Sequence, residues 1–164
     1  MGIEPSVFRN VLGHFPTGVT VVTSVGPNGP VGLTIGSFTS VSLEPPLVLF
    51  CVTSDSEAWQ AIRDRGAFVV NVLNDQQSDV CSAFASSLPD RFAGVSYRAG
   101  ANGAPVLDGV LAVIECEIYS VYDGGDHDVV VGRVDHLEVD EAVAADHGPL
   151  LFHTGRLGAF QAFG

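Results

Sequence analysis

The sequence predicts a mostly β protein, an antiparallel barrel of about seven strands with three short helices at its periphery. Runs rich in β-branched residues are separated by turn signals along most of the 164 residues. These runs do not alternate regularly with helical segments, which argues against a doubly wound parallel sheet. Hydrophobic residues make up 46% of the chain and charged residues 16%, so a large core can form and apolar surface remains for a second subunit.

Strands are predicted where β-branched and other apolar residues run together between turns. The longest alternating run covers residues 31–41, with Val31, Leu33 and Ile35 starting one of its two faces. Asp-Gly-Gly-Asp at 123–126 is a hairpin signal that joins two long runs. The expected strands are residues 18–25, 31–41, 47–52, 67–73, 110–122, 127–139 and 150–153.

Three segments have apolar residues at helical spacing. The first begins at Pro5 and ends before Pro16, because the residue before a proline avoids helical geometry. The expected helices are residues 4–14, 54–65 and 75–85. Residues 86–105 are dense in Gly, Pro, Ser and Asn and are expected to form an excursion loop. No repeat or linker interrupts the pattern, so residues 1–164 are predicted to be a single domain.

The charge of the chain excludes several classes of partner. Acidic residues number 19 against 7 basic ones, all of them arginine, and the net charge is −12. Nucleic acids and anionic membranes attract clustered positive charge, so neither is a predicted partner. Residues 1–15 lack the pattern of a signal peptide, and no stretch has the length of a bilayer span. The expected location is therefore cytoplasmic.

Motifs for metal binding, hydrolysis and phosphoryl transfer are missing. The three cysteines and five histidines show no metal-ligand spacing, so neither a zinc site nor a disulfide framework is predicted. Cys51 and Cys116 lie in apolar runs and are expected to be buried thiols. The chain has no nucleophile elbow, no GxGxxG fingerprint and no lysine for a Walker loop. No catalytic side chain is predicted.

Hydroxyl residues are unusually dense in two places. They are Thr34, Ser37, Thr39, Ser40 and Ser42 in the first group and Thr53, Ser54 and Ser56 in the second. On the rim of a barrel, hydroxyls and backbone N–H groups can hold a phosphate without lysine. Strand propensity and turn chemistry explain the same residues without any ligand, and both interpretations stay open at this point.

Four stretches taken together resemble a known family. They are FPTGVTVVT at 15–23, GLTIGSFTSVSLEPPLVLFCV at 32–52, FVVNVL at 68–73 and ECEIYSVYDGGDHDVVVGRV at 115–134. In this order and spacing they are similar to the flavin reductase domain of two-component flavin-dependent monooxygenases, which has the FMN-binding split β-barrel fold. The resemblance runs from about Phe8 to Phe160, almost the whole chain.

The resemblance implies a homodimer that binds FAD or FMN, oxidises NADH or NADPH, and releases reduced flavin to a separate monooxygenase. It implies that the strand from Thr34 to Ser40 contacts the flavin ring, that Thr53 to Ser56 help to hold the phosphate, and that Gly125-Asp126-His127 binds the nicotinamide nucleotide. The expected cofactor-binding residues are Thr17, Gly32, Thr34, Ile35, Gly36, Ser37, Ser40, Thr53, Ser54, Ser56, Phe92, Asp126 and His127.

This chain departs from the family pattern at two points. Gly36 stands where members often carry Asn, and Ile35 stands where they usually carry Ala. The basic residue often found near residues 54–59 is missing, so the phosphate anchor is undetermined. Arg9, Arg63, Arg91 and Arg156 are the candidate substitutes, and the sequence does not rank them.

The expected chemistry needs no catalytic side chain, because hydride transfer from nicotinamide to flavin belongs to the cofactors and the protein positions them. Among the site residues, His127 is expected to contact the nicotinamide nucleotide, and Asp126 to order the turn or pair with His127. Two other functions stay open on the sequence. One is an electron carrier with tightly bound flavin, and the other is a scaffold that has lost it.

Overall fold

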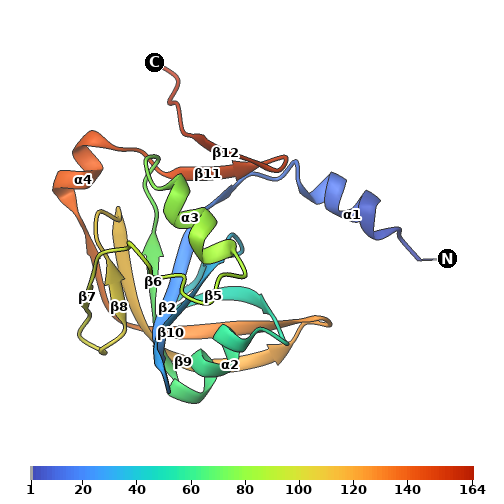
Figure 1. Cartoon of the computed structure of the whole chain (residues 1–164). Coiled ribbons are helices and arrows are strands. Elements are labelled where there is room, and N and C mark those ends of the chain that lie inside the picture. Colours follow the sequence, from blue (N-terminus) through green and yellow to red (C-terminus); the bar gives the residue numbers. More distant parts are fainter. Residues whose placement is uncertain (1) are drawn as a thin grey trace.

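One antiparallel sheet of seven strands forms the body of the molecule (Figure 1). The computed structural model describes residues 2–164. The strands are β2 (Thr20–Gly26), β3 (Gly29–Ile35), β4 (Thr39–Leu43), β5 (Pro46–Thr53), β6 (Ala67–Val72), β9 (Ala112–Asp123) and β10 (His127–Val139). They lie in the order β3-β2-β6-β9-β10-β5-β4, and every neighbouring pair is antiparallel. The predicted mostly β, antiparallel fold is confirmed.

Two smaller sheets and four helices surround this sheet. The other strands are β1 (Thr17–Gly18), β7 (Tyr97–Ala99), β8 (Pro105–Leu107), β11 (Leu150–His153) and β12 (Arg156–Ala159). The helices are α1 (Pro5–Leu12), α2 (Glu57–Arg65), α3 (Ser78–Ala85) and α4 (Glu141–Asp146). Strands β1, β11 and β12 form one small sheet, and β7 and β8 form a hairpin.

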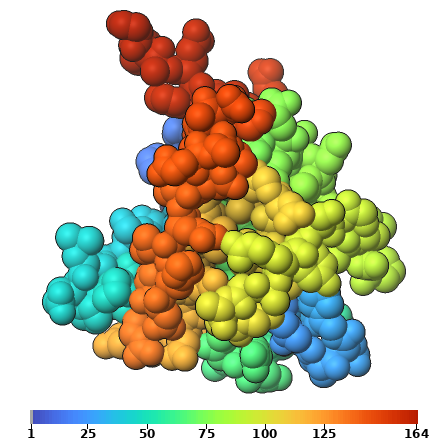
Figure 2. All heavy atoms as spheres, turned by 90° about the vertical axis from the view of Figure 1, so that its left-hand side faces the viewer, coloured from blue at the N-terminus to red at the C-terminus, as the bar shows by residue number. Residues whose placement is uncertain are grey.

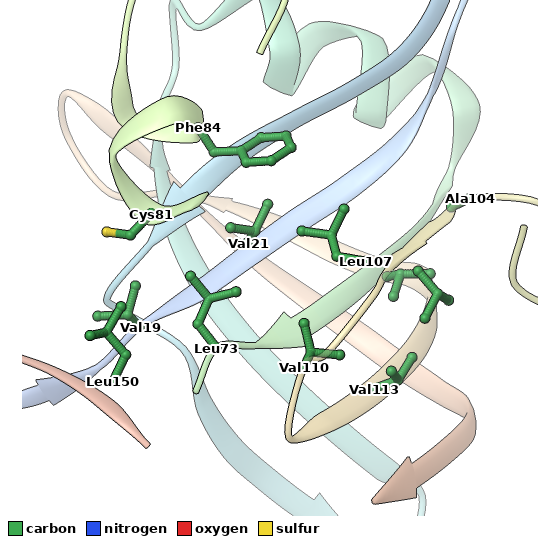
Figure 3. Packing of buried hydrophobic residues seen from close by; sticks show 12 residues of the cluster. Val19, Val21, Leu73, Cys81, Phe84, Ala104, Leu107, Val110, Val113 and Leu150 are labelled. Atoms are coloured by element: carbon green, nitrogen blue, oxygen red, sulfur yellow. The ribbon is translucent and has the colours of Figure 1, made fainter. Parts of the chain in front are cut away.

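The core consists of two clusters on opposite faces of the central strands. Because successive side chains of a strand point to opposite faces, Val69 of β6 enters one cluster and Val70 enters the other. The first cluster packs beneath α3, where Phe84 and Cys81 lie over Val21 of β2 (Figure 3). The second cluster includes Phe50, Trp59 and Phe68, whose rings meet edge to face. Helix α3 thus covers one face of the sheet, and helix α2 covers the other.

The cysteines behave mainly as small apolar residues. All three are free, and Cys81 and Cys116 are buried. Burial, reinforced by nearby Asp135 and Glu115, raises the pKa of the Cys116 thiol to about 12. The prediction of a buried thiol is confirmed for Cys116, whereas Cys51 is only half-buried because it lies on the outward face of β5.

The predicted single strand over residues 31–41 is wrong. Strand β3 ends at Ile35, residues 36–38 are not in a strand, and β4 begins at Thr39. Its expected alternation holds only as far as Ile35, because Thr39 and Val41 are exposed. Ser37 lies in the break. Its hydroxyl forms hydrogen bonds with the backbone N–H and carbonyl of Cys51 in β5, the groups that a continuous strand would have paired with.

The predicted excursion loop over residues 86–105 is also wrong in part, because it contains β7 and the start of β8. The buried Glu115 holds this hairpin onto β9, accepting hydrogen bonds from the backbone N–H of Ala101 at 3.0 Å and of Asn102 at 2.8 Å. Helix α4 and strand β12 were not expected, since six and four residues are too few to show a period. Residues 2–164 therefore contain four helices where three were expected.

Helix α1 projects from the body near the sheet that carries the C-terminus (Figure 1). Its apolar residues are exposed by half or more, namely Val7, Phe8, Val11 and Leu12. The C-terminal tail also stands away from the body (Figure 2), and Phe160 and Phe163 are exposed there. Among the described residues, no helix combines the length and the apolar character that spanning a membrane requires.

Candidate functional site

A groove with a volume of about 870 Å³ opens beside strand β3. The turn between β2 and β3 forms one wall, the start of α2 forms the second, and residues 87–92 form the third. Four of the expected site residues line it, namely Gly32, Thr53, Ser56 and Phe92. This volume is in the range of small-molecule sites.

The third wall is tied to the sheet by Arg91. Its Nη1 donates a hydrogen bond to the carbonyl oxygen of Gly32 at 3.0 Å. Of the four arginines that the sequence left unranked, Arg91 is the one among the groove-lining residues. Arg63 lies instead near Asp128, while Arg9 and Arg156 lie on α1 and β12. Arg91 is therefore the candidate anchor for an anionic ligand.

Phe92 gives the groove a rigid aromatic wall. Its ring meets Phe84 at a centroid distance of 4.8 Å and Tyr97 at 5.3 Å, both edge to face. Its backbone N–H donates to Oδ1 of Asp90 at 3.0 Å, which closes the turn before it. Edge-to-face packing leaves the ring fixed, so this wall is preorganised for a flat ligand.

A band of polar groups runs from the break after β3 to the hairpin at 123–126. The Ser37 hydroxyl accepts from the backbone N–H of Cys51 at 2.8 Å and lies 3.0 Å from the Cys51 carbonyl oxygen, to which it donates. Thr53 follows Cys51 by two residues, so both lie on the same face of β5. Thr53 is paired with His127 in the register of β5 and β10. The band thus joins the groove, through Thr53, to the Gly-Asp-His segment.

His127 is held in place by its neighbour in sequence. Its Nδ1 lies 2.7 Å from Oδ1 of Asp126, and the hydrogen bond from His127 is the main cause that lowers the pKa of Asp126. The Asp126 carbonyl also accepts from the backbone N–H of Ser54 at 3.2 Å. The structure therefore brings Ser54 next to Asp126 and His127 at one end of strands β5 and β10, although Ser54 is about 70 residues away in the sequence.

Asp128 connects this edge to helix α2. Its Oδ2 accepts from Trp59 Nε1 at 2.7 Å, its Oδ1 accepts from the Ser54 hydroxyl at 3.1 Å, and Arg63 Nη1 lies 3.6 Å from Oδ2. Trp59 is fully buried. Ser56 caps the N-terminus of helix α2, because its hydroxyl accepts from the Trp59 backbone N–H. Asp128 thereby sets the position of the loop 53–56 relative to His127.

Thr17 carries a buried hydroxyl that has no hydrogen-bond partner among the described residues. It faces Gly36, where a Cβ atom would come within 3.2 Å of the Thr17 Oγ1. Buried polar atoms without partners are rare in native proteins, and each one indicates a ligand, a water or a functional role. The missing partner makes this hydroxyl, next to Gly36, a candidate contact for a polar ligand.

Replacing Thr17 by valine tests this assignment. Removing an unsatisfied buried hydroxyl should raise the free energy of unfolding of the ligand-free protein by about 1 kcal/mol. The same change should weaken the binding of a polar ligand at this point about fivefold, because one hydrogen bond is lost. Thr20→Val is the matched control, since the Thr20 hydroxyl donates to the Ile35 carbonyl at 2.9 Å and its loss should destabilise. Unaltered ligand affinity in Thr17→Val would contradict the role.

Three of the expected site residues have a packing or hydrogen-bonding role in the fold, and a fourth lies exposed on an edge strand. A Cβ atom on Gly32 would come within 2.8 Å of the Phe84 ring, so glycine allows α3 to pack on β3. The Thr34 hydroxyl donates to the Cys81 carbonyl at 2.8 Å, and the Ile35 side chain is buried in the core. Ser40 is exposed on the edge strand β4. Except for Gly32, none of them lines the groove.

Sequence reasoning missed several residues of the site. Glu57, Ala58, Ala61 and Asp90 line the groove, and Asp128 supports it. Arg91 is next to the expected Phe92, but the sequence did not single it out among the four candidate arginines. Asp128 had no signal in the sequence, because its partners Ser54 and Trp59 are about 70 positions away.

Comparisons with known proteins agree on one family. The sequence profile described as flavin reductase like domain matches residues 12–161. The chain is 51% identical over 153 residues to the reductase subunit HsaB of a flavin-dependent monooxygenase from Mycobacterium tuberculosis, covering 93% of this chain and 81% of that protein.

Two solved structures are similar over nearly the whole chain. Nitrilotriacetate monooxygenase component B from Mycobacterium thermoresistibile superposes with a TM-score of 0.90 at 44% identity, covering 95% of this chain and 86% of that one. The NADH:FAD oxidoreductase SgcE6 of Streptomyces globisporus, in complex with NAD and FAD fragments, has a TM-score of 0.88 at 39% identity, covering 98% and 97%.

Proposed function

The chain belongs to the flavin reductase family, and from this premise we propose that its groove and polar band bind flavin and nicotinamide nucleotide side by side. It is an NAD(P)H-dependent flavin reductase, and it supplies reduced flavin to a partner monooxygenase. The observation that carries the proposed site is that Thr53 lies both in the groove and opposite His127. One residue thereby connects the two binding regions.

The flavin would be held by backbone amides and hydroxyls with Arg91 as the positive group. Thr17, Gly36 and Ser37 would border its ring, and Thr53 and Ser56 would hold its phosphate. When bound, flavin supplies the acceptor for a hydride from the reduced nicotinamide. The contribution of the protein is orientation, because correctly aligned reactants lose much of the entropic barrier.

Fluorescence titration and nucleotide oxidation test the function. Purified protein should be colourless after desalting and should oxidise NADH or NADPH only when free FAD or FMN is added. A yellow colour that survives desalting would support an electron carrier instead. Colourless protein that neither quenches flavin fluorescence nor oxidises the nucleotides would leave only a scaffold role.

Filling the groove tests where the ligands bind. Ala58 lines the groove at the start of α2, so Ala58→Phe should weaken flavin or nucleotide binding at least tenfold while the fold is retained. Asp64→Phe adds the same ring to the exposed face of α2, outside the groove, and should leave binding unchanged. Dissociation constants from fluorescence titration and KM values for NADH measure both. Equal effects of the two variants would place the ligands elsewhere.

His127 is proposed to contact the nicotinamide nucleotide, with Asp126 orienting its ring through the 2.7 Å contact. His127→Ala should raise the KM for NADH about tenfold and change flavin affinity by less than threefold. His136→Ala is the matched control, because His136 is exposed on the same strand but has no partner on β5, whereas His127 is paired with Thr53. Steady-state kinetics at saturating flavin measures the KM. An unchanged value in His127→Ala would remove this histidine from the site.

We also propose that residues 1–164 act as one domain and form a homodimer. The exposed apolar residues of α1 favour a second copy of the chain as their cover, because exposed apolar patches mark interaction surfaces. Sedimentation should give twice the 17.1 kDa chain mass, and a monomer at micromolar concentration would contradict the dimer. Three free cysteines support a location in the reducing cytoplasm.

A further inference from the structure

The groove is much larger than a single phosphate group requires. Its volume of about 870 Å³ lies in the upper part of the range of about 300–1,000 Å³ that is typical of ligand pockets. In the proposed function, the flavin phosphate alone lies there, at Thr53 and Ser56. Most of the groove is therefore left for a further part of a ligand that enters it at this phosphate.

The groove extends from the phosphate end to the turn between β2 and β3. Ser56 caps helix α2, and Ala61 lies five residues further along the chain, which is more than one helical turn. Ala61 lines the groove and lies against this turn, because a Cβ atom on Gly26 would come within 3.3 Å of the Ala61 Cβ. Ala61 and residues 27–30 therefore form the distal end of the groove.

The walls of the groove suit a flat base. The ring of Phe92 is held by edge-to-face contacts with Phe84 and Tyr97. Pro30 and Leu88 line the groove as well and add apolar surface. Fixed aromatic and apolar side chains can pack against a purine ring at little entropic cost. A nucleotide base is therefore a fitting occupant.

Arg91 supplies a cation for phosphate groups in the same groove. Its contact with the Gly32 carbonyl uses one of the five N–H donors of the guanidinium. A planar guanidinium binds phosphate oxygens through pairs of such donors. FAD differs from FMN by an adenosine monophosphate joined to the flavin phosphate, so it adds a second phosphate and an adenine. Both additions match groups that line the groove.

We propose that the groove binds the adenosine monophosphate half of FAD, and that the protein therefore selects FAD over FMN. This inference rests on the proposed function, because it starts from the flavin phosphate at Thr53 and Ser56. Family membership does not choose between the two flavins, since the family contains reductases named for each. Arg91 would bind the second phosphate, and the adenine would reach towards the distal end.

Binding measurements on the wild-type protein test the selection without any substitution. Isothermal titration calorimetry should give a dissociation constant for FAD at least about tenfold below that for FMN. ADP carries the adenosine and two phosphates of FAD without the flavin ring. It should therefore displace FAD from the protein in the absence of any nicotinamide nucleotide, and it should compete less well with FMN.

Ala61→Leu fills the distal end and tests which part of the ligand lies there. The affinity for FAD should fall at least about fivefold, whereas the affinity for FMN should change less than twofold, because FMN ends at its phosphate. Asp64→Leu is the matched control, since it adds the same side chain at an exposed position of α2 outside the groove. It should change neither affinity, and the melting temperatures show whether both variants are folded.

Three results would overturn the selection. They are equal affinities of the wild-type protein for FAD and FMN, equal losses for both flavins in Ala61→Leu, and ADP that competes with NADH without displacing FAD. If Ala61→Leu does not fold, the wild-type affinities and the ADP competition decide. If neither flavin binds at all, the proposed function itself fails, and this result differs from equal binding of both flavins.

Discussion

Asp128→Ala is expected to lower the free energy of unfolding by about 3 kcal/mol and to weaken flavin and NADH binding by more than tenfold. The buried indole N–H of Trp59 loses its acceptor at 2.7 Å, and an unsatisfied buried donor costs about 1–3 kcal/mol. The Ser54 hydroxyl also loses its partner at 3.1 Å, which frees the loop that carries Thr53. Urea denaturation and flavin fluorescence titration measure the two effects.

Asp135→Ala is the matched control for this prediction. Asp135 is on the same strand, is exposed, and lies 3.4 Å from Arg133 in a surface ion pair, which contributes little to stability. The stability and ligand affinity of Asp128→Asn should fall between those of Asp128→Ala and Asp135→Ala. An amide oxygen can still accept from Trp59, but the charge facing Arg63 is lost. If Asp128→Ala has the same free energy of unfolding and the same ligand affinities as Asp135→Ala, the carboxylate does not support the site.

Gly132→Ala is expected to lower the free energy of unfolding by about 3 kcal/mol, the upper end for overpacking a core. A Cβ atom at this position on β10 would lie 2.6 Å from Cζ of Phe68 and 3.2 Å from Cβ of Cys116. Phe68 is fully buried and packs on Phe50 at a centroid distance of 5.3 Å, so its ring has no free space to move into. The melting temperature should fall by about 6–12 °C.

Gly158→Ala is the control for the glycine substitution itself. It lies on strand β12, where a Cβ atom would meet nothing within 4 Å, so stability should change by less than about 0.5 kcal/mol. The double variant Gly132→Ala with Phe68→Leu should be less destabilised than the sum of the single variants, because the smaller side chain removes the overlap. Additive effects would show that the contact with Phe68 is not the cause.

Most strands followed from local patterns. Runs such as 67–73 and 127–139 coincide closely with β6 and β10, because β-branched residues bounded by turns have few alternatives. The hairpin at 123–126 was also predictable from its two glycines, and Gly125 has a φ of +89°. The break at Gly36 was not predictable, because the alternation of small and polar residues continues through it in the sequence.

The candidate site was only partly predictable. The family resemblance pointed to Thr53, Ser56 and Phe92, which line the groove, and to His127, which lies beside it. It gave no means of choosing Arg91 among four arginines. The choice depends on a contact with Gly32, 59 positions earlier in the chain, and no local pattern reports a contact of that separation.

The sequence alone therefore determined the mostly β, antiparallel class and most of the long strands and their turns, because side-chain alternation and turn chemistry act over a few neighbouring residues. Only the tertiary structure decided that a groove exists, that Arg91 lines it, and that Thr53 connects it to His127. These features arise from strand pairing and loop packing between distant segments, such as Ser54 with Asp128 across 74 positions. The free energy of such contacts depends on where the whole sheet places each residue, which no short stretch encodes.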